Sequence, residues 1–329
     1  MISVAMASYN GKEYITKQLE SIFHQTRKVD EIVIVDDCST DGTAALIEGL
    51  QKEHKEIVLY QNEENLGYKR NFKKACSLCH GDYIFLCDQD DLWVDEKVEV
   101  MMSIMENRPD IMALASSFDV INGNDETQKV EVLKGFSNNN FLRREVPENV
   151  LTKITFEELT IQNSFQGCAL VITKEMSELF QKCFTEELFH DWLINLLAAS
   201  RDGMYYINRV LFHYRIHGDN TIGITPPETF SGIEHLVKTN RLHIRTLFAE
   251  NIIHVLKILE SVDPDLKKFQ PDYEDKIDFY QNHIEYLSKG NITKLIAQNK
   301  TPYYKQIKRL RARVMDVYFA ARQKVRAED

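Results

Sequence analysis

The stretch Tyr83-Ile-Phe-Leu-Cys-Asp-Gln-Asp-Asp-Leu-Trp93 joins a short apolar run to three carboxylates. Residues 83–87 have the β-branched and aromatic composition of a buried strand. Three carboxylates at the end of such a strand repel one another, and burying them without partners is very costly. A hard cation such as Mg²⁺ or Mn²⁺ removes this conflict, because it prefers carboxylate oxygens and accepts phosphates as further ligands. The alternative is an acidic turn in which an aspartate caps the next helix.

Strands and helices alternate before this stretch. The apolar runs 2–7, 31–35 and 57–60 predict strands. Residues 12–25 carry apolar side chains at helical spacing, and further helices are expected after Gly42 and Gly67. Four alternations within about 90 residues predict an α/β fold with a doubly wound, mostly parallel sheet. Ligands bind beyond the carboxyl ends of the strands in such sheets.

Unusual polar groups follow each of the four predicted strands. They are Ser8-Tyr9-Asn10, Asp36-Asp37, Asn65 and Asp88–Asp91. The first strand is not followed by G-x-G-x-x-G, and no G-x-x-x-x-G-K-[ST] occurs, which argues against a dinucleotide cofactor and a P-loop NTPase. Carboxylates beside a Lys/Arg-rich helix suit a nucleoside diphosphate held through a metal ion.

Composition describes an ordinary globular protein of 329 residues, with 43% hydrophobic and 27% charged residues. The net charge of −10 argues against a general nucleic-acid binder. Residues 1–6 lack the basic leader of a signal peptide, and no apolar run approaches the ~18 residues of a membrane span. The six cysteines lie mostly in or beside apolar runs, as free thiols do in a reducing compartment. We therefore expect a cytoplasmic protein.

Four blocks of sequence occur in order within about the first hundred residues. They are Val4-Ala-Met-Ala-Ser-Tyr-Asn10-Gly11, Ile34-Val-Asp-Asp-Cys-Ser-Thr-Asp-Gly42, Asn65-Leu-Gly-Tyr-Lys-Arg-Asn71 and Asp88-Gln-Asp-Asp-Leu-Trp93. Together they resemble the nucleotide-binding half of a family 2 glycosyltransferase with the GT-A fold. The last block also resembles bacterial rhamnosyltransferases that build cell-surface polysaccharides. The first block departs from the family, which often has Pro-Thr-Tyr-Asn where this chain has Met-Ala-Ser-Tyr-Asn.

The resemblance implies a set of residues that bind the nucleotide sugar. They are Ser8, Tyr9, Asp36, Asp37, Asn65, Arg70, Asp88, Gln89 and Gly167. It places Ser8 and Tyr9 at the base, Asp36 and Asp37 (the second above all) toward a pyrimidine ring, Asp88 at the ribose and Arg70 near the diphosphate. Simpler roles stay open, with Tyr9 as packing, Asp36 as a helix cap, Arg70 as a solvated charge and Gly167 as a strand kink.

The resemblance also implies metal-binding and catalytic residues. Asp90 would bind Mn²⁺ or Mg²⁺, and His217 would reach the metal or the diphosphate, unless it is a structural histidine. Asp191, in Phe189-His-Asp-Trp192 at the start of an apolar helix, would be the general base, because inverting glycosyl transfer needs a carboxylate to take the acceptor proton. The alternative is that Asp191 caps this helix. His190 is a second candidate for the base.

The expected organisation is a nucleotide-sugar-binding half over 1–110, an acceptor-binding half over 111–225 and a helical extension over 226–329. Within the second half we expect a loop or flap at 122–150, a strand at 165–172 and paired strands at 204–208 and 210–215. Helices are expected at 228–261, 271–288 and 302–326. The last is basic and amphipathic, so it would dock peripherally on the inner face of the cell membrane, on the body of the protein, or on a second subunit in a homodimer.

These observations favour an inverting, metal-dependent glycosyltransferase of cell-surface polysaccharide synthesis. The donor expected first is dTDP-rhamnose, and the acceptor is a glycan or a lipid-linked sugar. Two alternatives stay open, a UDP-hexose transferase (glucose, galactose or GlcNAc) of the same fold and a catalytically silent nucleotide-sugar-binding module. A sugar-phosphate nucleotidyltransferase would need a basic, glycine-rich loop after the first strand, and Ser8-Tyr9-Asn10-Gly11 is short and uncharged.

Overall fold

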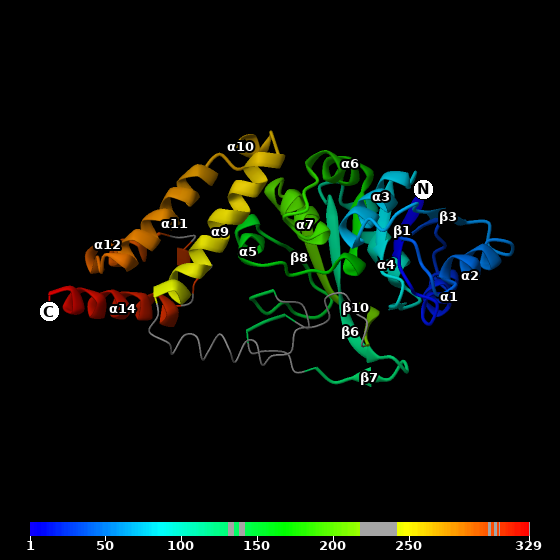
Figure 1. The fold of residues 1–329 in the computed structure, drawn as a ribbon, viewed down its shortest axis with the longest axis horizontal. Helices are drawn as coiled ribbons and strands as arrows, with labels where there is room; N and C mark the ends of the chain where they lie inside the picture. The colour runs from blue at the N-terminus through cyan, green and yellow to red at the C-terminus, as the bar shows by residue number, and fades with distance from the viewer. Residues whose placement is uncertain are drawn as a thin grey trace. The chain divides into compact units, whose positions relative to one another are not determined.

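The structure is a computed structural model that describes residues 1–130, 135–137, 142–217, 242–301, 304–305, 308 and 310–328. The chain divides into two compact units (Figure 1). Unit 1 comprises Met1–Leu159 and Asn163–Gly223, and unit 2 comprises Thr160–Gln162 and Ile224–Asp329. The assignment of residues 1–110 and 111–225 to donor and acceptor remains a prediction.

Four parallel strands form the first half of the sheet in unit 1. Their order is β3 (Ile57–Gln61), β2 (Glu31–Asp36), β1 (Ile2–Ser8) and β4 (Tyr83–Cys87). The central β1 has five fully or almost fully buried residues from position 2 to position 6, because helices cover both faces of a parallel sheet. Since these strands run in the same direction, their carboxyl ends share one edge, as the sequence predicted.

The second half of the sheet mixes directions. Its main strands continue the order as β9 (Leu170–Thr173), β6 (Ala113–Asn122), β10 (Met204–Ile216) and β5 (Leu92–Trp93). The β6–β10 pair is parallel, whereas β9 is antiparallel to both β4 and β6. Short strands β7 (Thr127–Gln128) and β8 (Leu151–Lys153) pair with β6 and β10. The sheet is therefore mixed but mostly parallel, which confirms the predicted fold class.

Seven α-helices connect these strands among the described residues. They are α1 (Ile15–Phe23), α2 (Thr43–Leu50), α3 (Tyr68–Leu78), α4 (Lys97–Asn107), α5 (Phe156–Ile161), α6 (Lys174–Cys183) and α7 (His190–Ser200). The strand order advances from β1 to β3 and then returns to β4, so right-handed crossovers place α1 and α2 on one face and α3 on the other. Helices α3, α6 and α7 contact one another over that second face.

Two expectations about strands are wrong. Residues 204–208 and 210–215 are not paired strands but parts of the single strand β10, whose register shifts between Ile207 and Val210 and again between Val210 and Phe212. The polar Asn208-Arg209 pair looks like a turn in sequence, yet it lies in an irregular part of a continuous strand. The strand expected at 165–172 begins only at Leu170, because Gly167–Ala169 forms a 3₁₀ turn.

The segment expected to be a loop or flap, 122–150, is partly described. The β7 strand pairs with the end of β6, and Ser137 bridges to Leu142. Residues 131–134 and 138–141 lie outside the described residues. A role as a flap over the acceptor remains a prediction.

Unit 2 is helical where it is described. Its elements are α9 (Leu242–Val262), α10 (Leu266–Phe269), α11 (Tyr273–Ser288), α12 (Ile292–Gln298) and α14 (Leu310–Glu328). Of the expected helices 228–261 and 302–326, residues 228–241, 302–303, 306–307 and 309 lie outside the described residues. Helix α12 was not predicted, although Asn291 is its N-cap and accepts a hydrogen bond from the Lys294 N–H. None of the helices in the described part of the chain has the length and apolar composition needed to cross a membrane.

A buried charged network joins the helices of unit 2. Asp316 on α14 is 1% exposed and pairs with Arg245 of α9 at 3.0 Å and with Lys308. The Tyr304 hydroxyl donates to the same carboxylate at 3.4 Å. The His283 imidazole lies 3.7 Å away, and burial lowers its pKa to about 4, so it is neutral near pH 7. One carboxylate therefore ties together side chains from several segments of this unit.

We expect Asp316→Asn to lower the free energy of unfolding of unit 2 by about 3–5 kcal/mol, because it leaves buried cations without their carboxylate. The measurement is a urea titration followed by far-UV circular dichroism. Glu285→Gln is the control, since it removes an exposed α11 ion pair with Lys289 and should cost at most about 0.5 kcal/mol. Equal shifts in the two variants would contradict a structural role for the network.

Candidate active site

The acidic turn after β4 is tied to the end of β1 by Gln89. The Tyr9 N–H donates to Gln89 Oε1, and Gln89 Nε2 donates to the Tyr9 carbonyl, each at 2.9 Å. This arrangement requires glycine at position 11, where a Cβ would lie 2.0 Å from Gln89 Oε1. The first and fourth sequence blocks therefore meet through a pair of hydrogen bonds that fix both loops.

Arg215, near the end of β10, holds the other side of the turn. Its fully buried guanidinium donates from Nε to the Asp90 carbonyl at 2.6 Å, and its backbone N–H donates to Asp91 Oδ1 at 3.1 Å. It also forms an ion pair with Asp125 and lies 4.8 Å from the centre of the Tyr14 ring. The position of Asp90 therefore depends on residues far along the chain.

His217, two residues beyond Arg215, contacts Asp90 directly. The distance from His217 Nε2 to Asp90 Oδ2 is 2.9 Å, and the imidazole packs on Tyr14 with ring centroids 4.7 Å apart. The two residues predicted to bind the metal are thus brought together. Adjacent ligands of an octahedral ion with bonds of about 2.1 Å are about 3.0 Å apart, so this separation is compatible with both atoms binding one ion.

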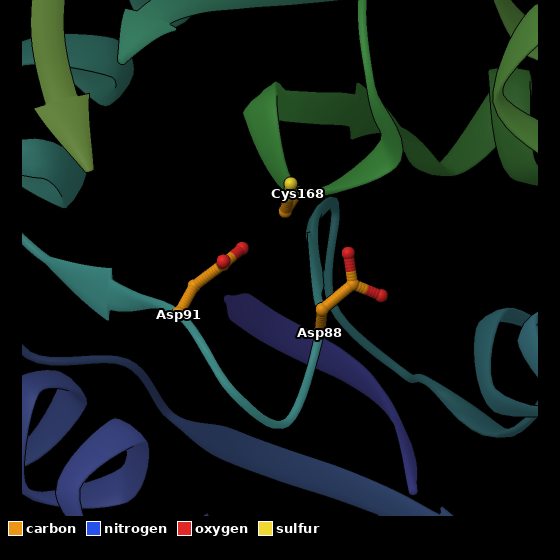
Figure 2. Close-up of side chains that lie close together, drawn as sticks. All are labelled: Asp88, Asp91 and Cys168. Atoms are coloured by element: carbon orange, nitrogen blue, oxygen red, sulfur yellow. The ribbon is translucent and has the colours of Figure 1, made fainter. Parts of the chain in front are cut away.

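Asp88, Asp91 and Cys168 form a tight group, and Figure 2 shows both carboxylates on the turn after β4 with the Cys168 side chain facing them. One potential ligand atom from each residue lies within 4.8 Å of the others. Asp91 Oδ2 is buried and has no hydrogen-bond partner among the described residues. Burial and the charge of Asp90 raise the pKa of Asp88 to about 7 and that of Asp91 well above its usual value.

Lys97 at the start of α4 supplies a buried positive charge beside this group. Its side chain is fully buried, donates from Nζ to the Cys168 carbonyl at 2.7 Å, and lies 4.2 Å from the centre of the Trp93 ring. Burial lowers the pKa of Lys97 to about 8, while Asp91 and Asp88 oppose that shift. The cation offsets part of the repulsion among the carboxylates.

The donor atoms at this edge suit a hard divalent cation. Asp88 and Asp90 offer carboxylate oxygens, and His217 offers an imidazole nitrogen, which Mn²⁺ accepts readily. Cys168 fits less well, because burial keeps its pKa well above the usual value and the thiol protonated. The structure therefore contains an acidic group able to take an ion such as Mg²⁺ or Mn²⁺.

Asp191 lies in the first turn of α7 and is not its cap, since the N-cap residue is Phe189. Asp191 Oδ1 accepts a hydrogen bond from the Trp192 N–H at 2.7 Å. Its charge contributes to the raised pKa of Asp88, so the two carboxylates interact electrostatically. A Cβ on Gly167 would lie 3.8 Å from the Asp191 Cβ, and the next residue, Cys168, lies with Asp88 and Asp91, so the residue predicted to be the base is near the acidic turn.

Gly167 and His190 pack against one another beside Asp191. A Cβ on Gly167 would lie 2.8 Å from His190 Nε2, so only glycine fits without a shift. The His190 ring stacks on Phe72 with centroids 4.2 Å apart, and neither ring nitrogen has a hydrogen-bond partner among the described residues. Burial lowers the pKa of His190, which keeps the imidazole neutral.

Asp36 and Asp37 are buried and already hydrogen-bonded. Asp36 accepts from the Ser8 hydroxyl at 2.9 Å and from Ser39. Asp37 accepts from Asn62 Nδ2 and from the N–H groups of Leu66 and Gly67 at 2.7–2.8 Å. Both carboxylates therefore hold the loops at the carboxyl ends of β1, β2 and β3.

Asn65 and Arg70 extend this side of the site. Asn65 Nδ2 donates to the Asp37 carbonyl at 3.1 Å, which links the third block to the second. Arg70 on α3 is 56% exposed and donates from Nε to Glu186 Oε1 at 2.7 Å. In this structure Arg70 therefore pairs with a surface carboxylate, and its predicted contact with a diphosphate remains untested.

Four residues near the acidic turn were not predicted from sequence. They are Asp91 as a buried member of the acidic group, Lys97, Cys168 and Arg215. In sequence Lys97 stands among charged residues, in Asp95-Glu-Lys-Val-Glu99, so nothing local indicated that it is buried. Cys168 and Arg215 carry no local signal either.

Comparison with known sequences finds a family match in the first half of the chain. Residues 3–163 match the profile of glycosyl transferase family 2. The chain is 35% identical over 108 residues to the putative teichuronic acid biosynthesis glycosyltransferase TuaG of Bacillus subtilis, covering 33% of this chain and 43% of that relative. It is 28% identical over 231 residues to the dTDP-rhamnosyl transferase RfbG of Shigella flexneri, covering 66% of this chain and 73% of the relative. An uncharacterized glycosyltransferase of Methanocaldococcus jannaschii is 30% identical, and the chain spans 58% of its length.

Comparison with solved structures supports the fold. S. aureus TarS 1-349, crystallised with UDP-GlcNAc, superposes with a TM-score of 0.53 and 16% sequence identity. The match covers 99% of this chain and 91% of that one. At this level of identity the likeness concerns the fold alone, and it agrees with the GT-A type expected from sequence.

The raised pKa of Asp88 has a consequence for cation binding. Below its pKa of about 7 the group is mostly protonated, and above it the carboxylate attracts a cation. We therefore expect the affinity for Mn²⁺ to rise by about tenfold per pH unit below pH 7 and to level off above it. Calorimetry between pH 6 and pH 8 measures this affinity.

The Asp88→Asn variant should remove the pH dependence of Mn²⁺ affinity. Glu48→Gln, which changes an exposed residue of α2, is the control and should keep it. An unchanged pH dependence in Asp88→Asn would assign the titration to another group.

Proposed function

Residues 3–163 match glycosyl transferase family 2, and on that premise we propose that the chain is an inverting, metal-dependent glycosyltransferase of this family. The observation that supports this most is the group of Asp88, Asp90 and His217 with Asp191 nearby. A carboxylate pair at one strand end suits a nucleotide diphosphate held through a cation. A separate carboxylate on α7 suits proton transfer from an acceptor.

In this proposal the nucleoside lies at the carboxyl ends of β1 and β2. Ser8, Tyr9 and the adjoining Gln89 line the base pocket, and Asp88 accepts from the ribose hydroxyls. Asp37 already accepts three N–H bonds, and a carboxylate has about four acceptor positions, so one remains for a pyrimidine N–H. Asp36 and Asn65 act on the base through the loops that they hold. Arg70 would give up its ion pair with Glu186 and bind the diphosphate instead, which replaces one charge-assisted hydrogen bond with another.

The cation would be held by Asp90 and His217, with Mn²⁺ or Mg²⁺ as the expected ion. When bound, it supplies charge that stabilises the departing diphosphate. The chain's own contribution is to position its ligands. Arg215 fixes the Asp90 backbone, and Tyr14 packs against the His217 ring.

Asp191 is the proposed general base. The Trp192 N–H fixes Oδ1, and we assign Oδ2 to the acceptor proton. As the acceptor oxygen attacks the anomeric carbon from the face opposite the diphosphate, the oxygen–carbon bond forms, the bond to the diphosphate breaks, and the proton passes to Asp191. Gly167 lets the backbone lie close to the α7 turn where donor and acceptor sugars meet.

Rhamnose from dTDP-rhamnose is the proposed donor sugar. It is supported by the residues of the acidic block, Asp88-Gln-Asp-Asp-Leu-Trp93, and by similarity to RfbG, a dTDP-rhamnosyl transferase. The proposed acceptor is a glycan or lipid-linked sugar in cell-surface polysaccharide synthesis, in line with the name of TuaG. UDP-hexose transfer and silent nucleotide-sugar binding are the competing proposals.

Two substitutions separate binding from chemistry. We expect Asp90→Ala to abolish the Mn²⁺-dependent part of dTDP binding, measured by calorimetry with and without the ion. We expect Asp191→Asn to leave that binding intact and to lower transfer by about 10²–10⁴-fold, the usual range for a general base. Unchanged dTDP and UDP affinity in Asp90→Ala would contradict the metal assignment. Undiminished turnover in Asp191→Asn would mean that another group is the base.

A panel of nucleotide sugars tests the donor. We expect hydrolysis or transfer to be fastest with dTDP-rhamnose, followed by UDP-hexoses, with release of nucleoside diphosphate as the readout. Faster turnover with a UDP-hexose would select the first alternative. Binding without turnover of any donor, with and without candidate acceptors, would favour the silent module.

A further inference from the structure

Helix α14 carries a row of exposed apolar side chains. Leu310 is 66% exposed, Val314 56% and Tyr318 51%. The first two are the most exposed large apolar side chains in the described part of the chain. Leaving large apolar surfaces in water is unfavourable, and a contiguous patch often marks an interaction site.

The three residues lie on one face because they follow a spacing of four. A different face of the same helix holds it in unit 2. There Asp316, Phe319 and Ala320 are buried, and Phe319 and Ala320 share a core with Leu287 and Leu295. The exposed row is therefore not needed for the packing of α14 within its unit.

Positive charge accompanies the apolar row. Arg311 and Arg322 are exposed and follow Leu310 and Tyr318 by one and four positions, and the Arg322 guanidinium lies 5.5 Å from the centre of the Tyr318 ring. Asp316, the only acidic residue between positions 303 and 326, is buried and paired with Arg245 and Lys308. The outer face of α14 is thus apolar and cationic, on a protein whose net charge is −10.

We propose that this face docks on an anionic lipid surface. Leu310, Val314 and Tyr318 would enter the boundary between head groups and acyl chains, and Arg311 and Arg322 would contact lipid phosphates. Arginine suits this position because its stem lies along apolar surface while its charged end stays at the head groups. A second copy of the chain fits less well, because two such faces packed on each other bring like charges together. The proposed contact with lipid is a property additional to the proposed transfer activity and does not depend on it.

Vesicle flotation of the full chain tests the proposal. The vesicles contain phosphatidylcholine alone or phosphatidylcholine with phosphatidylglycerol. We expect binding to the anionic vesicles only, decreasing as salt is added because the attraction is partly electrostatic. The variant with Leu310→Ser, Val314→Ser and Tyr318→Ser should need at least tenfold more lipid for half-maximal binding. Val150→Ser, which removes another exposed apolar side chain, is the matched control and should bind as the unchanged protein does.

Arg311→Gln with Arg322→Gln separates the charge from the apolar row. This variant should lose the preference for anionic vesicles, and circular dichroism should show unchanged helix content in both multiple variants. No binding of the unchanged protein, or equal binding by the triple-serine variant, would overturn the proposal. Conversion of a dimer into a monomer by the serine substitutions, with no vesicle binding, would also overturn it and assign the face to a second copy. Neither outcome depends on transfer activity.

Discussion

The buried guanidinium of Arg215 determines the shape of the acidic turn. The guanidinium donates to the Asp90 carbonyl and pairs with Asp125 in the β6–β7 turn, while the backbone N–H of Arg215 donates to Asp91. A buried arginine is stable only with such partners, so β10, the turn after β4 and the turn after β6 must form together. His217 follows on the same segment and reaches Asp90 because Arg215 has fixed that turn.

Positive side chains close to the acidic turn partly balance the charge of its aspartates. Asp88, Asp90 and Asp91 repel one another, while the charges of Lys97 and Arg215 offset part of that repulsion. Burial, together with the remaining repulsion, raises the pKa values of Asp88 and Asp91. A group of carboxylates that is not fully compensated by the protein has a physical reason to attract a cation, and the same reason connects the proposed metal site to the proposed use of a diphosphate donor.

Unit 2 separates its charges in another way. The Asp316 carboxylate engages Arg245 and Lys308 inside the helical unit, so these cations stabilise the fold. Arg311 and Arg322 stay outside with the apolar row of Leu310, Val314 and Tyr318. The basic residues that the sequence shows around this helix therefore divide into a buried, structural group and an exposed group, for which we propose contact with an anionic lipid surface.

Much of unit 1 followed from local sequence patterns. Apolar runs and helical spacing indicated β1 to β4 and the helices between them. Because the carboxyl ends of parallel strands share one edge of the sheet, the sequence also indicated that Asp88 to Asp91 lie at the same edge as Ser8 and Asp37. These inferences succeeded because periodicity and strand direction are local properties. Where a local pattern was ambiguous, prediction failed, as at Asn208-Arg209, which reads as a turn but continues β10.

Tertiary structure alone decided which distant residues share the site. Cys168 lies beside Asp88 and Asp91, its carbonyl accepts a hydrogen bond from Lys97, and Arg215 binds a turn 125 positions earlier. No periodicity encodes such pairs, since they arise when β9 and β10 enter the sheet beside strands formed much earlier in the chain. The sequence by itself determined that acidic and polar side chains gather at the strand ends, because strand direction is a local property, whereas packing of the late strands determined which side chains hold them in place.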